Sequence, residues 1–258
     1  MARTAVRGRL TWQTATVARI RQETETARTI GLTTSYWPGH RAGQHLDVRL
    51  TAEDGYQAER SYSIASAPGE PPEITVQRLD DGEVSPYLAG EARPGDAIEI
   101  RGPIGGYFVW DESDAVSPLL LAAGGSGIVP LRSILRYRAR SGLIDRAGPA
   151  RLLYSARSLE DVIYRAELDR GQPGLAVTYV LTRHQPPGWA GHAGRVDGEL
   201  LGRLAWAADR NPLAFACGPT SFVETIATWL TGLGYPADRV KTERYGGRDL
   251  REGPDGSG

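Results

Sequence analysis

The sequence predicts a six-stranded antiparallel barrel followed by a doubly wound parallel sheet with helices on both faces. Three observations support this prediction. Strand-like segments separated by turns occupy residues 1–112, whereas from Pro118 onward apolar runs alternate with helical patterns. The chain has 258 residues, a length that favours two domains over one core. We therefore expect a barrel domain over residues 1–112, an α/β domain over 113–246 and a flexible tail over 247–258.

The barrel prediction depends on six segments with the β-branched and alternating composition of strands. Turn sequences such as Pro38-Gly39 and Pro94-Gly95 separate them. The predicted strands cover residues 12–22, 29–34, 45–50, 56–63, 74–78 and 97–101. Six short strands at this spacing are typical of a small antiparallel barrel. Ser85 followed by Pro86 predicts one helical turn before the last strand, with the serine as its N-cap.

The α/β prediction begins with residues 119–123, a continuous apolar run typical of a strand buried on both faces. A glycine-rich turn and a helix from Pro130 to about Arg140 follow it. Further strands are predicted over 152–155, 177–181, 213–217 and 240–243, with helices over 162–168 and 221–233. Strands that alternate with helices in this way predict a doubly wound sheet.

Composition excludes several classes of protein. A net charge of -1 provides no general basic field for nucleic acid, and no apolar run approaches the ~18 residues of a membrane-spanning helix. The start of the chain lacks the apolar region of a secretory signal, and the single cysteine predicts a reducing cytoplasm. One cysteine cannot supply the four thiolates of a plant-type [2Fe–2S] cluster, or the two of a Rieske centre. The four histidines have no metal-pair spacing, so we expect neither an iron–sulfur cluster nor a metal.

The segment Arg60-Ser61-Tyr62-Ser63 has the groups that a flavin requires. Strand alternation places Arg60 and Tyr62 on one face, where an arginine can bind a cofactor phosphate and a tyrosine can stack on a planar ring. Ser63 can hydrogen-bond the flavin edge near N5. At Gly82–Ser85, the free amides at the start of the short helix favour a diphosphate. The alternatives are an exposed strand with a surface arginine, and a loop with a capping serine.

A glycine-rich turn, Gly124-Gly125-Ser126-Gly127-Ile128-Val129-Pro130, joins the first buried strand to its helix. It lacks the third glycine of the Rossmann fingerprint, but its order still directs backbone amides at an anion. A tight turn that binds no ligand is the alternative. A flavin site followed by a dinucleotide site predicts hydride chemistry.

Polar residues follow the next two strands at their carboxyl ends, where ligands bind open α/β sheets. They are Ser155, Arg157, Thr182 and Arg183. Two hydroxyl–arginine pairs suit a ribose 2′-phosphate and favour NADP(H) over NAD(H), with surface arginines as the alternative. Cys217-Gly218-Pro219 closes another buried strand at the same edge. Its thiol could lie beside the nicotinamide, or it could be a small core hydrophobe.

These motifs, in this order, resemble the ferredoxin–NADP(+) reductase family, in particular its compact bacterial FAD-binding oxidoreductases without an iron–sulfur domain. The resemblance covers residues 12–246. It is carried by Arg60–Ser63, Gly82–Ser85, Gly102-Pro103-Ile104-Gly105, Gly124–Pro130, Cys217–Pro219 and Glu243-Arg244-Tyr245-Gly246. It implies an FAD-binding barrel and an NAD(P)-binding α/β domain, with FMN a less favoured flavin.

The resemblance also implies roles for individual residues. The flavin would be bound by Arg60, Ser61, Tyr62, Ser63, Val76, Gln77, Arg78, Gly82, Glu83, Val84 and Ser85. The nicotinamide dinucleotide would contact Gly125, Ser126, Gly127, Ile128, Pro130, Ser155, Arg157, Thr182, Arg183, Cys217, Gly218 and Pro219. The residues implied at the reacting atoms are Ser63, Cys217, Glu243 and Tyr245, and Tyr245 would cover the flavin face opposite Tyr62.

The implied activity is hydride transfer from NADPH to FAD, followed by single-electron transfer to a separate acceptor protein. Ferredoxin, an oxygenase component and a haem protein all remain open as acceptors; nucleic acid and membrane insertion are not expected. A free-flavin reductase is the first alternative. An electron-transfer or sensor subunit with no turnover alone is the second. One departure is that residues follow Tyr245, where photosynthetic members end.

Overall fold

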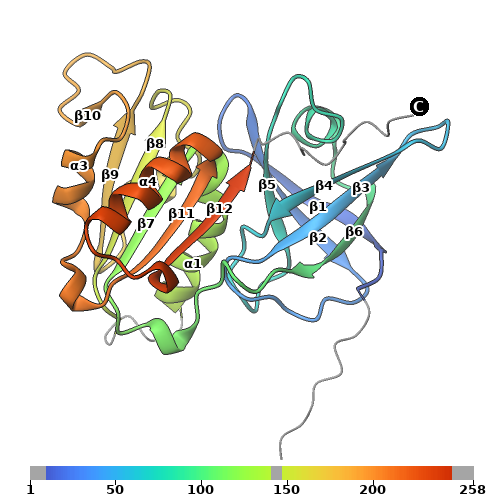
Figure 1. Ribbon diagram of the computed structural model, residues 1–258. Helices are drawn as coiled ribbons and strands as arrows, with labels where there is room; N and C mark the ends of the chain where they lie inside the picture. Colours follow the sequence, from blue (N-terminus) through green and yellow to red (C-terminus); the bar gives the residue numbers. More distant parts are fainter. Residues whose placement is uncertain (1–9, 141–146, 246–258) are drawn as a thin grey trace, which may run out of the picture.

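The computed structural model describes residues 10–140 and 147–245, and the tail expected over 247–258 lies outside this range. Two six-stranded sheets lie side by side, and the chain completes the first before it begins the second (Figure 1). The first sheet is antiparallel and the second is parallel. The predicted fold class is therefore confirmed.

The first sheet is a barrel that is open along one side. Its strands are β1 (Gln13–Gln22), β2 (Ala27–Thr34), β3 (His45–Thr51), β4 (Gln57–Ser63), β5 (Glu73–Gln77) and β6 (Ala97–Ile104), in the order β4-β3-β6-β1-β2-β5. Alternate residues such as Val17, Ile30 and Ile100 fill its interior. Among the described residues, a single bridge between Ile64 and Ile74 connects the two edge strands. The gap between β4 and β5 faces the second sheet (Figure 1).

The short helix of the barrel differs from its prediction. It is a π-helical turn, η1 (Tyr87–Glu91), and Ser85 does not cap it. The Ser85 hydroxyl instead accepts a hydrogen bond from the Leu79 amide at 3.1 Å. The predicted cap was wrong because the serine folds back onto the loop before the helix. This bond holds residues 79–85 in a compact loop beside β5.

The second sheet is doubly wound. Its strands are β7 (Leu119–Gly124), β8 (Ala150–Ala156), β9 (Leu175–Leu181), β10 (His192–Ala193), β11 (Leu213–Pro219) and β12 (Val240–Tyr245), in the order β10-β9-β8-β7-β11-β12. The chain runs outward from β7 in one direction and then continues from β11 in the other. The switch point therefore lies between β7 and β11, where parallel sheets of this kind bind ligands at the carboxyl ends.

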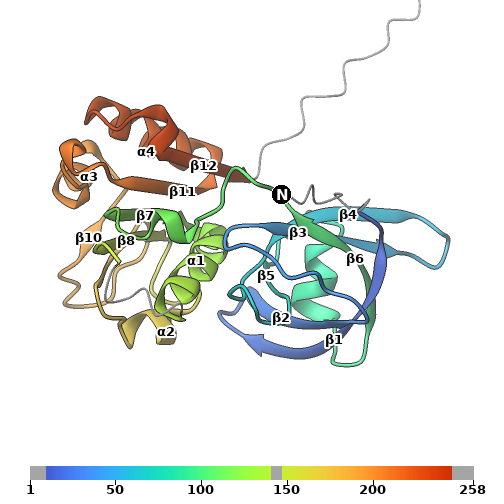
Figure 2. The ribbon, with the colours of Figure 1, turned by 90° about the horizontal axis from the view of Figure 1, so that it is seen from below.

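Helices cover both faces of this sheet (Figure 2). Helices α1 (Ile128–Arg140) and α2 (Arg165–Asp169) lie on one face, and α3 (Gly198–Leu204) and α4 (Thr220–Gly232) lie on the other. The strand β7 shows the reason, because Leu119 and Leu121 pack toward α1 while Leu120 and Ala122 pack toward α4. The remaining turns are η2 (Glu112–Asp114), η3 (Gly125–Gly127), η4 (Ala208–Arg210) and η5 (Ala237–Arg239).

Several boundaries differ from the predictions. Helix α1 begins at Ile128, two residues before the predicted start, because η3 leads directly into it. The helix predicted over 162–168 is confined to α2, since residues 162–164 form a buried loop. Strand β10 and helix α3 were not predicted. A signal for α3 was present: Asp197 accepts from the Leu200 amide at 2.8 Å as an N-cap, and two leucines follow.

One apolar cluster spans both sheets. The cluster that contains β7 and α1 also includes Ala27, Ala42, Ala65, Phe108 and Trp110 of the barrel side. Phe108 meets Phe215 edge to face, with ring centroids 5.1 Å apart. The sheets are therefore packed against each other rather than loosely linked.

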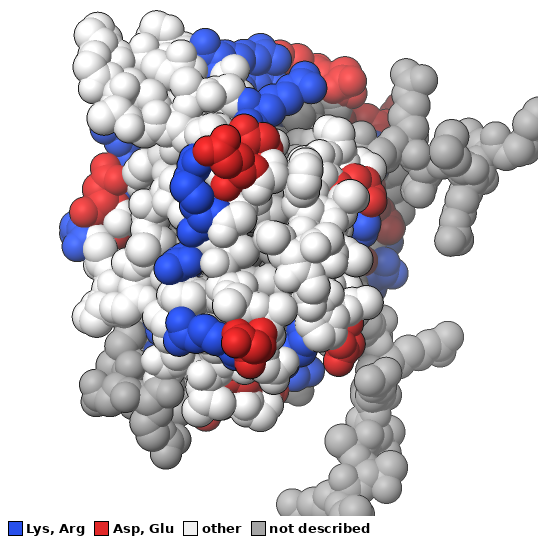
Figure 3. Space-filling model, turned by 60° about the vertical axis from the view of Figure 1, so that its left-hand side comes forward, with Lys and Arg blue, Asp and Glu red and all other residues white. Residues whose placement is uncertain are grey.

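The surface has no strongly charged face in the view of Figure 3, where basic and acidic side chains lie next to one another on a largely uncharged surface. Within residues 10–140 and 147–245, no helix combines the length and the hydropathy needed to cross a membrane. The same residues contain no group of three potential ligands that could hold a metal ion.

Candidate functional site

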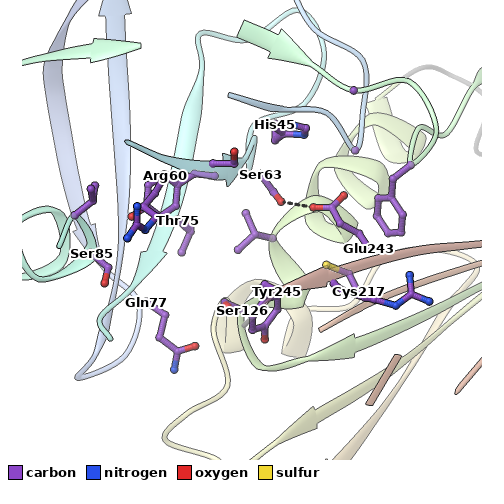
Figure 4. Close-up of a pocket in the computed structure, with 18 of the residues that line it drawn as sticks. His45, Arg60, Ser63, Thr75, Gln77, Ser85, Ser126, Cys217, Glu243 and Tyr245 are labelled. Carbon is purple, nitrogen blue, oxygen red and sulfur yellow. Dashed lines mark hydrogen bonds between the residues drawn. The ribbon is translucent and has the colours of Figure 1, made fainter. Parts of the chain in front are cut away.

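A cavity of about 630 Å³ lies between the open side of the barrel and the carboxyl edge of the second sheet. Strands β4 and β5 form one wall, and β11 and β12 form the other (Figure 4). It is bordered by Gly43, His45, Arg60, Ser61, Tyr62, Ser63, Thr75, Gln77, Leu79, Gly82, Glu83, Val84, Ser85, Gly105, Gly106, Tyr107, Phe108, Ser126, Val129, Cys217, Thr242, Glu243, Arg244 and Tyr245. Neither sheet forms the cavity alone.

All four residues of Arg60–Ser63 border the cavity, so alternation along β4 does not separate the residues that reach it from those that do not. Burial raises the pKa of the Tyr62 hydroxyl, so the phenol stays protonated. The Arg60 guanidinium lies 2.5 Å from a carboxylate oxygen of Glu83, and this carboxylate also accepts from the Tyr56 hydroxyl. Both members of the Arg60–Glu83 pair are about half exposed. The guanidinium therefore remains accessible to an anion that enters the cavity.

Ser61 has a different partner from its neighbours. Its hydroxyl donates to Asp47 at 2.6 Å, and Asp47 also accepts from Arg101 at 2.7 Å. Ser61 borders the cavity, but its hydrogen bond fixes the pairing of β4 with β3. We assign it to the support of the strand.

Of the three residues predicted to bind the flavin at the end of β5, only one borders the cavity. Gln77 borders it together with Thr75, whereas the Val76 side chain is buried in the barrel interior. Arg78 bonds Asp80 at 3.0 Å and does not border the cavity. The reason is the two-residue period of a strand, which turns neighbours to opposite faces. All four residues of Gly82–Ser85 do border it.

The opposite wall brings together Cys217 and Glu243, which are register partners on β11 and β12. The Ser63 hydroxyl donates to the Glu243 carboxylate at 3.2 Å, which joins the two sheets across the cavity (Figure 4). Burial raises the pKa of Glu243, and the bond from Ser63 opposes this rise. Burial, with the nearby Glu243 charge, raises the pKa of the Cys217 thiol. Cys217 is thus a protonated thiol and a poor nucleophile.

The Tyr245 side chain packs against the glycine-rich turn. Its hydroxyl donates to the Gly124 carbonyl, and the ring lies beside Ser126 (Figure 4). The pKa of the hydroxyl is raised to about 12, first because of its burial. The Tyr245 hydroxyl therefore occupies the Gly124 carbonyl at the start of the glycine-rich turn.

The glycine-rich turn has a packing function that the sequence did not reveal. A Cβ atom at Gly127 would lie 2.0 Å from the Cys217 carbonyl oxygen, so the turn presses directly on β11. Ser126 borders the cavity, but Gly125, Gly127, Ile128 and Pro130 do not, and neither do Gly218 and Pro219. Close packing against β11 therefore accounts for Gly127 without a ligand, and the contact of this turn with a dinucleotide stays a prediction.

We predict that Gly127→Ala lowers the free energy of unfolding by about 1–3 kcal/mol, the usual cost of overpacking. The added methyl group has to displace the β11 backbone. Gly202→Ala in α3 is the control: no atom lies within 4 Å of its Cβ position, so stability should hold or rise. Urea denaturation of both variants measures the effect, and equal midpoints would contradict the packing argument.

The residues predicted to bind an adenosine phosphate lie together at the sheet edge, outside the cavity. Ser155 is the last residue but one of β8, and the Arg183 amide donates to the Arg157 carbonyl at 2.9 Å. Thr182 donates to the Ala156 carbonyl at 3.2 Å. Both arginine side chains are exposed. The structure therefore places two exposed arginines on adjacent backbone segments just beyond the carboxyl ends of β8 and β9.

Sequence reasoning missed His45, Thr75, Tyr107 and Phe108, which also border the cavity. His45 is the register partner of Ser63 on β3, and burial lowers the pKa of its imidazole. The sequence offered no signal for this histidine, because strand register is a long-range property. Tyr107 and Phe108 follow the predicted Gly102–Gly105 motif, which was the only pointer to them.

Two family descriptions match the chain. Residues 20–109 match the oxidoreductase FAD-binding domain, and residues 121–228 match the oxidoreductase NAD-binding domain. Ferredoxin--NADP reductase B of Sorangium cellulosum (strain So ce56) is 37% identical over 214 residues, which cover 79% of this chain and 84% of that protein. The glycine betaine monooxygenase reductase subunit of Pseudomonas aeruginosa (strain UCBPP-PA14) is 30% identical over 212 residues, covering 79% of this chain and 56% of that protein.

Solved structures share the fold. A ferredoxin NADP+ reductase from Neisseria gonorrhoeae with bound FAD and NADP aligns with a TM-score of 0.77 at 20% identity, over 90% of this chain and 98% of that chain. The flavohem-like FAD/NAD binding domain of nitric oxide dioxygenase from Vibrio cholerae O1 biovar El Tor aligns with a TM-score of 0.79 at 22% identity, over 91% of this chain and 99% of that chain.

The residues present fit a flavin. The cavity combines the accessible Arg60 guanidinium, four aromatic rings (Tyr62, Tyr107, Phe108 and Tyr245), polar side chains and the loop of residues 82–85. The fold and site define an FAD-dependent NAD(P)H oxidoreductase. The chain belongs to the ferredoxin–NADP reductase family.

Proposed function

We propose that FAD lies in the 630 Å³ cavity and that the nicotinamide of NADPH enters beside Cys217. The observation that carries this proposal is the Ser63–Glu243 hydrogen bond, because it joins a barrel strand to a strand of the second sheet inside the cavity. Bound FAD supplies the conversion of a hydride into single electrons. Arg60 and Gly82–Ser85 would hold its phosphates, with the domain division proposed near residues 112–113.

Three residues of this chain would surround the reacting atoms: Ser63, Cys217 and Tyr245. The Ser63 hydroxyl is oriented by Glu243, so it presents a fixed dipole to a ring in the cavity. Cys217 is buried and protonated, so we propose that it packs against the nicotinamide without forming a bond. Tyr245 must leave the Gly124 carbonyl before the turn can receive a phosphate.

We propose NADP(H) as the preferred dinucleotide because Arg157 and Arg183 lie together at the sheet edge. Arg157→Ala should raise the KM for NADPH roughly 10–100-fold, the loss expected for a hydrogen bond to a charged group. The KM for NADH should not change, since NADH lacks the 2′-phosphate.

Steady-state kinetics with both nucleotides test this preference, and Arg203→Ala on α3 is the control. Arg203 is exposed and pairs with Glu199, away from the sheet edge that carries Arg157. An equal rise in KM for NADPH and for NADH in the Arg157 variant would show that this arginine does not bind the 2′-phosphate.

We propose that the electrons pass to a separate acceptor protein. The relatives named above are a ferredoxin reductase and a reductase subunit of a monooxygenase. Cys217 is the single cysteine of this chain, so the chain cannot supply the four thiolates of a [2Fe–2S] cluster. A cluster that receives the electrons would therefore be held by the acceptor. A ferredoxin, an oxygenase component and a haem protein are the candidate acceptors.

Two experiments test the proposed function. The absorbance spectrum of the purified protein should show bound flavin, and anaerobic titration with NADPH should bleach it at lower concentration than NADH. If the flavin leaves on gel filtration and turnover depends on added flavin, the chain is instead a free-flavin reductase. Colourless protein that binds no flavin would exclude both activities.

A further inference from the structure

A buried arginine connects the two domains. Arg132 lies on α1 and is 2% exposed. Its Nε donates to Glu167 at 2.9 Å, while its Nη1 lies 3.3 Å from the Ala65 carbonyl and 3.5 Å from Glu73 on β5. The guanidinium also stands over the Tyr164 ring, with its carbon 4.2 Å from the ring centroid. We call Arg132, Glu73, Glu167 and Tyr164 the interdomain cluster.

A row of hydroxyl groups continues the cluster into the barrel. Tyr164 donates to the Thr75 hydroxyl, which lies 2.8 Å from the Thr29 hydroxyl, and Thr29 donates to Glu23 at 2.5 Å. Each hydroxyl has one proton to donate, so the row runs in one direction from Tyr164 to the Glu23 carboxylate. Thr75 borders the flavin cavity. The cluster therefore reaches the wall of that cavity.

Tyr164 adopts a conformation that bulky residues seldom take. Its φ is 63°, although it is not glycine, and it immediately precedes α2. Such a conformation is unfavourable for a residue with a bulky side chain and persists where surrounding contacts enforce it. Here the contacts are the Arg132 guanidinium on its ring and Thr75 at its hydroxyl. The backbone is strained in a way that delivers this ring to the interface.

The cluster does not maximise stability. Arg132 Nη2 has no hydrogen-bond partner among the described residues, although it is buried. Burying an arginine without pairing all of its donors costs free energy that an apolar side chain would avoid. Buried ionic groups of this kind are better explained by the specific geometry that they impose.

The two elements that the cluster joins are those that border the two ligand sites. Glu73, Thr75 and Gln77 share the face of β5 that looks toward the second domain, and the last two border the flavin cavity. Helix α1 begins directly after the glycine-rich turn, four residues before Arg132. We propose that Arg132 and Tyr164 are positioning residues that lock β5 against α1 and so fix the distance over which hydride passes. This proposal rests on the proposed function.

The first test uses the apo-protein and needs no bound flavin. Wild-type apo-protein should unfold as one calorimetric transition, because the apolar cluster shared by the two sheets and the interdomain cluster together couple the two domains. Arg132→Met keeps an unbranched, flexible side chain, although a shorter one, and removes every polar contact of Arg132. It should split the unfolding into two transitions. The control is Arg203→Met on α3, which removes an exposed arginine whose partner, Glu199, lies on the same helix, and it should leave one transition. One transition in Arg132→Met, or two in the wild type, would overturn the coupling.

The second test separates positioning from folding. Stopped-flow reduction by NADPH should be about 10–100-fold slower in Arg132→Met, the effect expected of a small misplacement of reacting groups. The KM for NADPH should stay within about twofold, because the binding residues are intact, and the long-wavelength absorbance of nicotinamide stacked on flavin should weaken. Unchanged absorbance and rate, or a change in KM alone, would overturn the proposal.

Tyr164→Phe keeps the test decisive if Arg132→Met does not fold. It removes only the hydroxyl that reaches Thr75 and retains the ring beneath Arg132. Hydride transfer should slow about fivefold or more, with KM unchanged. A wild-type rate in a folded Tyr164→Phe variant would reject Tyr164 as a positioning residue. A wild-type protein that binds no flavin would reject the proposed function, while the calorimetric result would still decide the coupling.

Discussion

Arg60→Ala is expected to release the flavin. Arg60 is the accessible guanidinium on the barrel wall of the cavity, and its partner there, Glu83, cannot replace it as a cation. A charge-assisted bond from arginine to phosphate contributes about 1.5–3 kcal/mol, so the dissociation constant for FAD should rise roughly 10–100-fold. Fluorescence titration of apo-protein with FAD measures it.

Arg41→Ala is the matched control for this loss. Arg41 is as exposed as Arg60 and is also paired with a carboxylate, Asp111 at 2.9 Å, but it does not border the cavity. Its removal should leave the FAD affinity unchanged. Full stoichiometric flavin in purified Arg60→Ala would count against the placement of the cofactor phosphates.

Ser63→Ala is expected to keep the flavin and slow its reduction by about 100-fold, at the lower end of the range for proton-handling groups. The hydroxyl is oriented by Glu243 across the cavity, so its loss removes a fixed dipole at the reacting edge. Stopped-flow reduction by NADPH measures the rate. Ser113→Ala removes a hydroxyl that likewise bonds a carboxylate at 3.2 Å, far from the cavity, and should have no effect.

The same variant makes a directional prediction about pH. Burial raises the pKa of Glu243 above its usual 4.5, while the Ser63 hydroxyl lowers it. Removing the hydroxyl therefore moves the titration of Glu243 to higher pH, and the corresponding limb of the rate profile should move with it. In Glu243→Gln the limb should disappear. A limb that stays in place in Ser63→Ala would assign it to another group.

Glu243 also links folding to pH. Its folded pKa is raised, so at pH values between 4.5 and that folded pKa the native state binds more protons than the unfolded state. The free energy of unfolding should therefore fall as the pH rises through this interval. Glu243→Gln should flatten this dependence in urea titrations collected across the range.

Local sequence patterns were enough for most of the fold. The switch from turn-separated strands to alternating strands and helices near Pro118 matches the boundary between the two sheets. The failures were short elements: α3 has seven residues and β10 has two, so neither contains enough repeats to show a period. Ser85 was misread because its hydroxyl partner, Leu79, belongs to the preceding loop.

Part of the site was also within reach of the sequence. Arg60, Tyr62 and Ser63 lie on one strand, so alternation alone limits where they point. A sequence motif cannot tell which residues of a strand face a ligand. Thr75 borders the cavity, whereas its neighbour Val76 faces the barrel interior. The motif located the strand without distinguishing its faces.

By itself the sequence determined the class of chemistry, because the types of residue in its short motifs and their order along the chain are local properties. Only the tertiary structure decided how those motifs meet. The Ser63–Glu243 bond spans 180 residues, and the contact between Arg132 and Glu73 spans 59. Contacts at such separations are set by strand register and by the packing of two sheets, and no local pattern encodes either. The cavity exists because the open side of one sheet faces the carboxyl edge of the other.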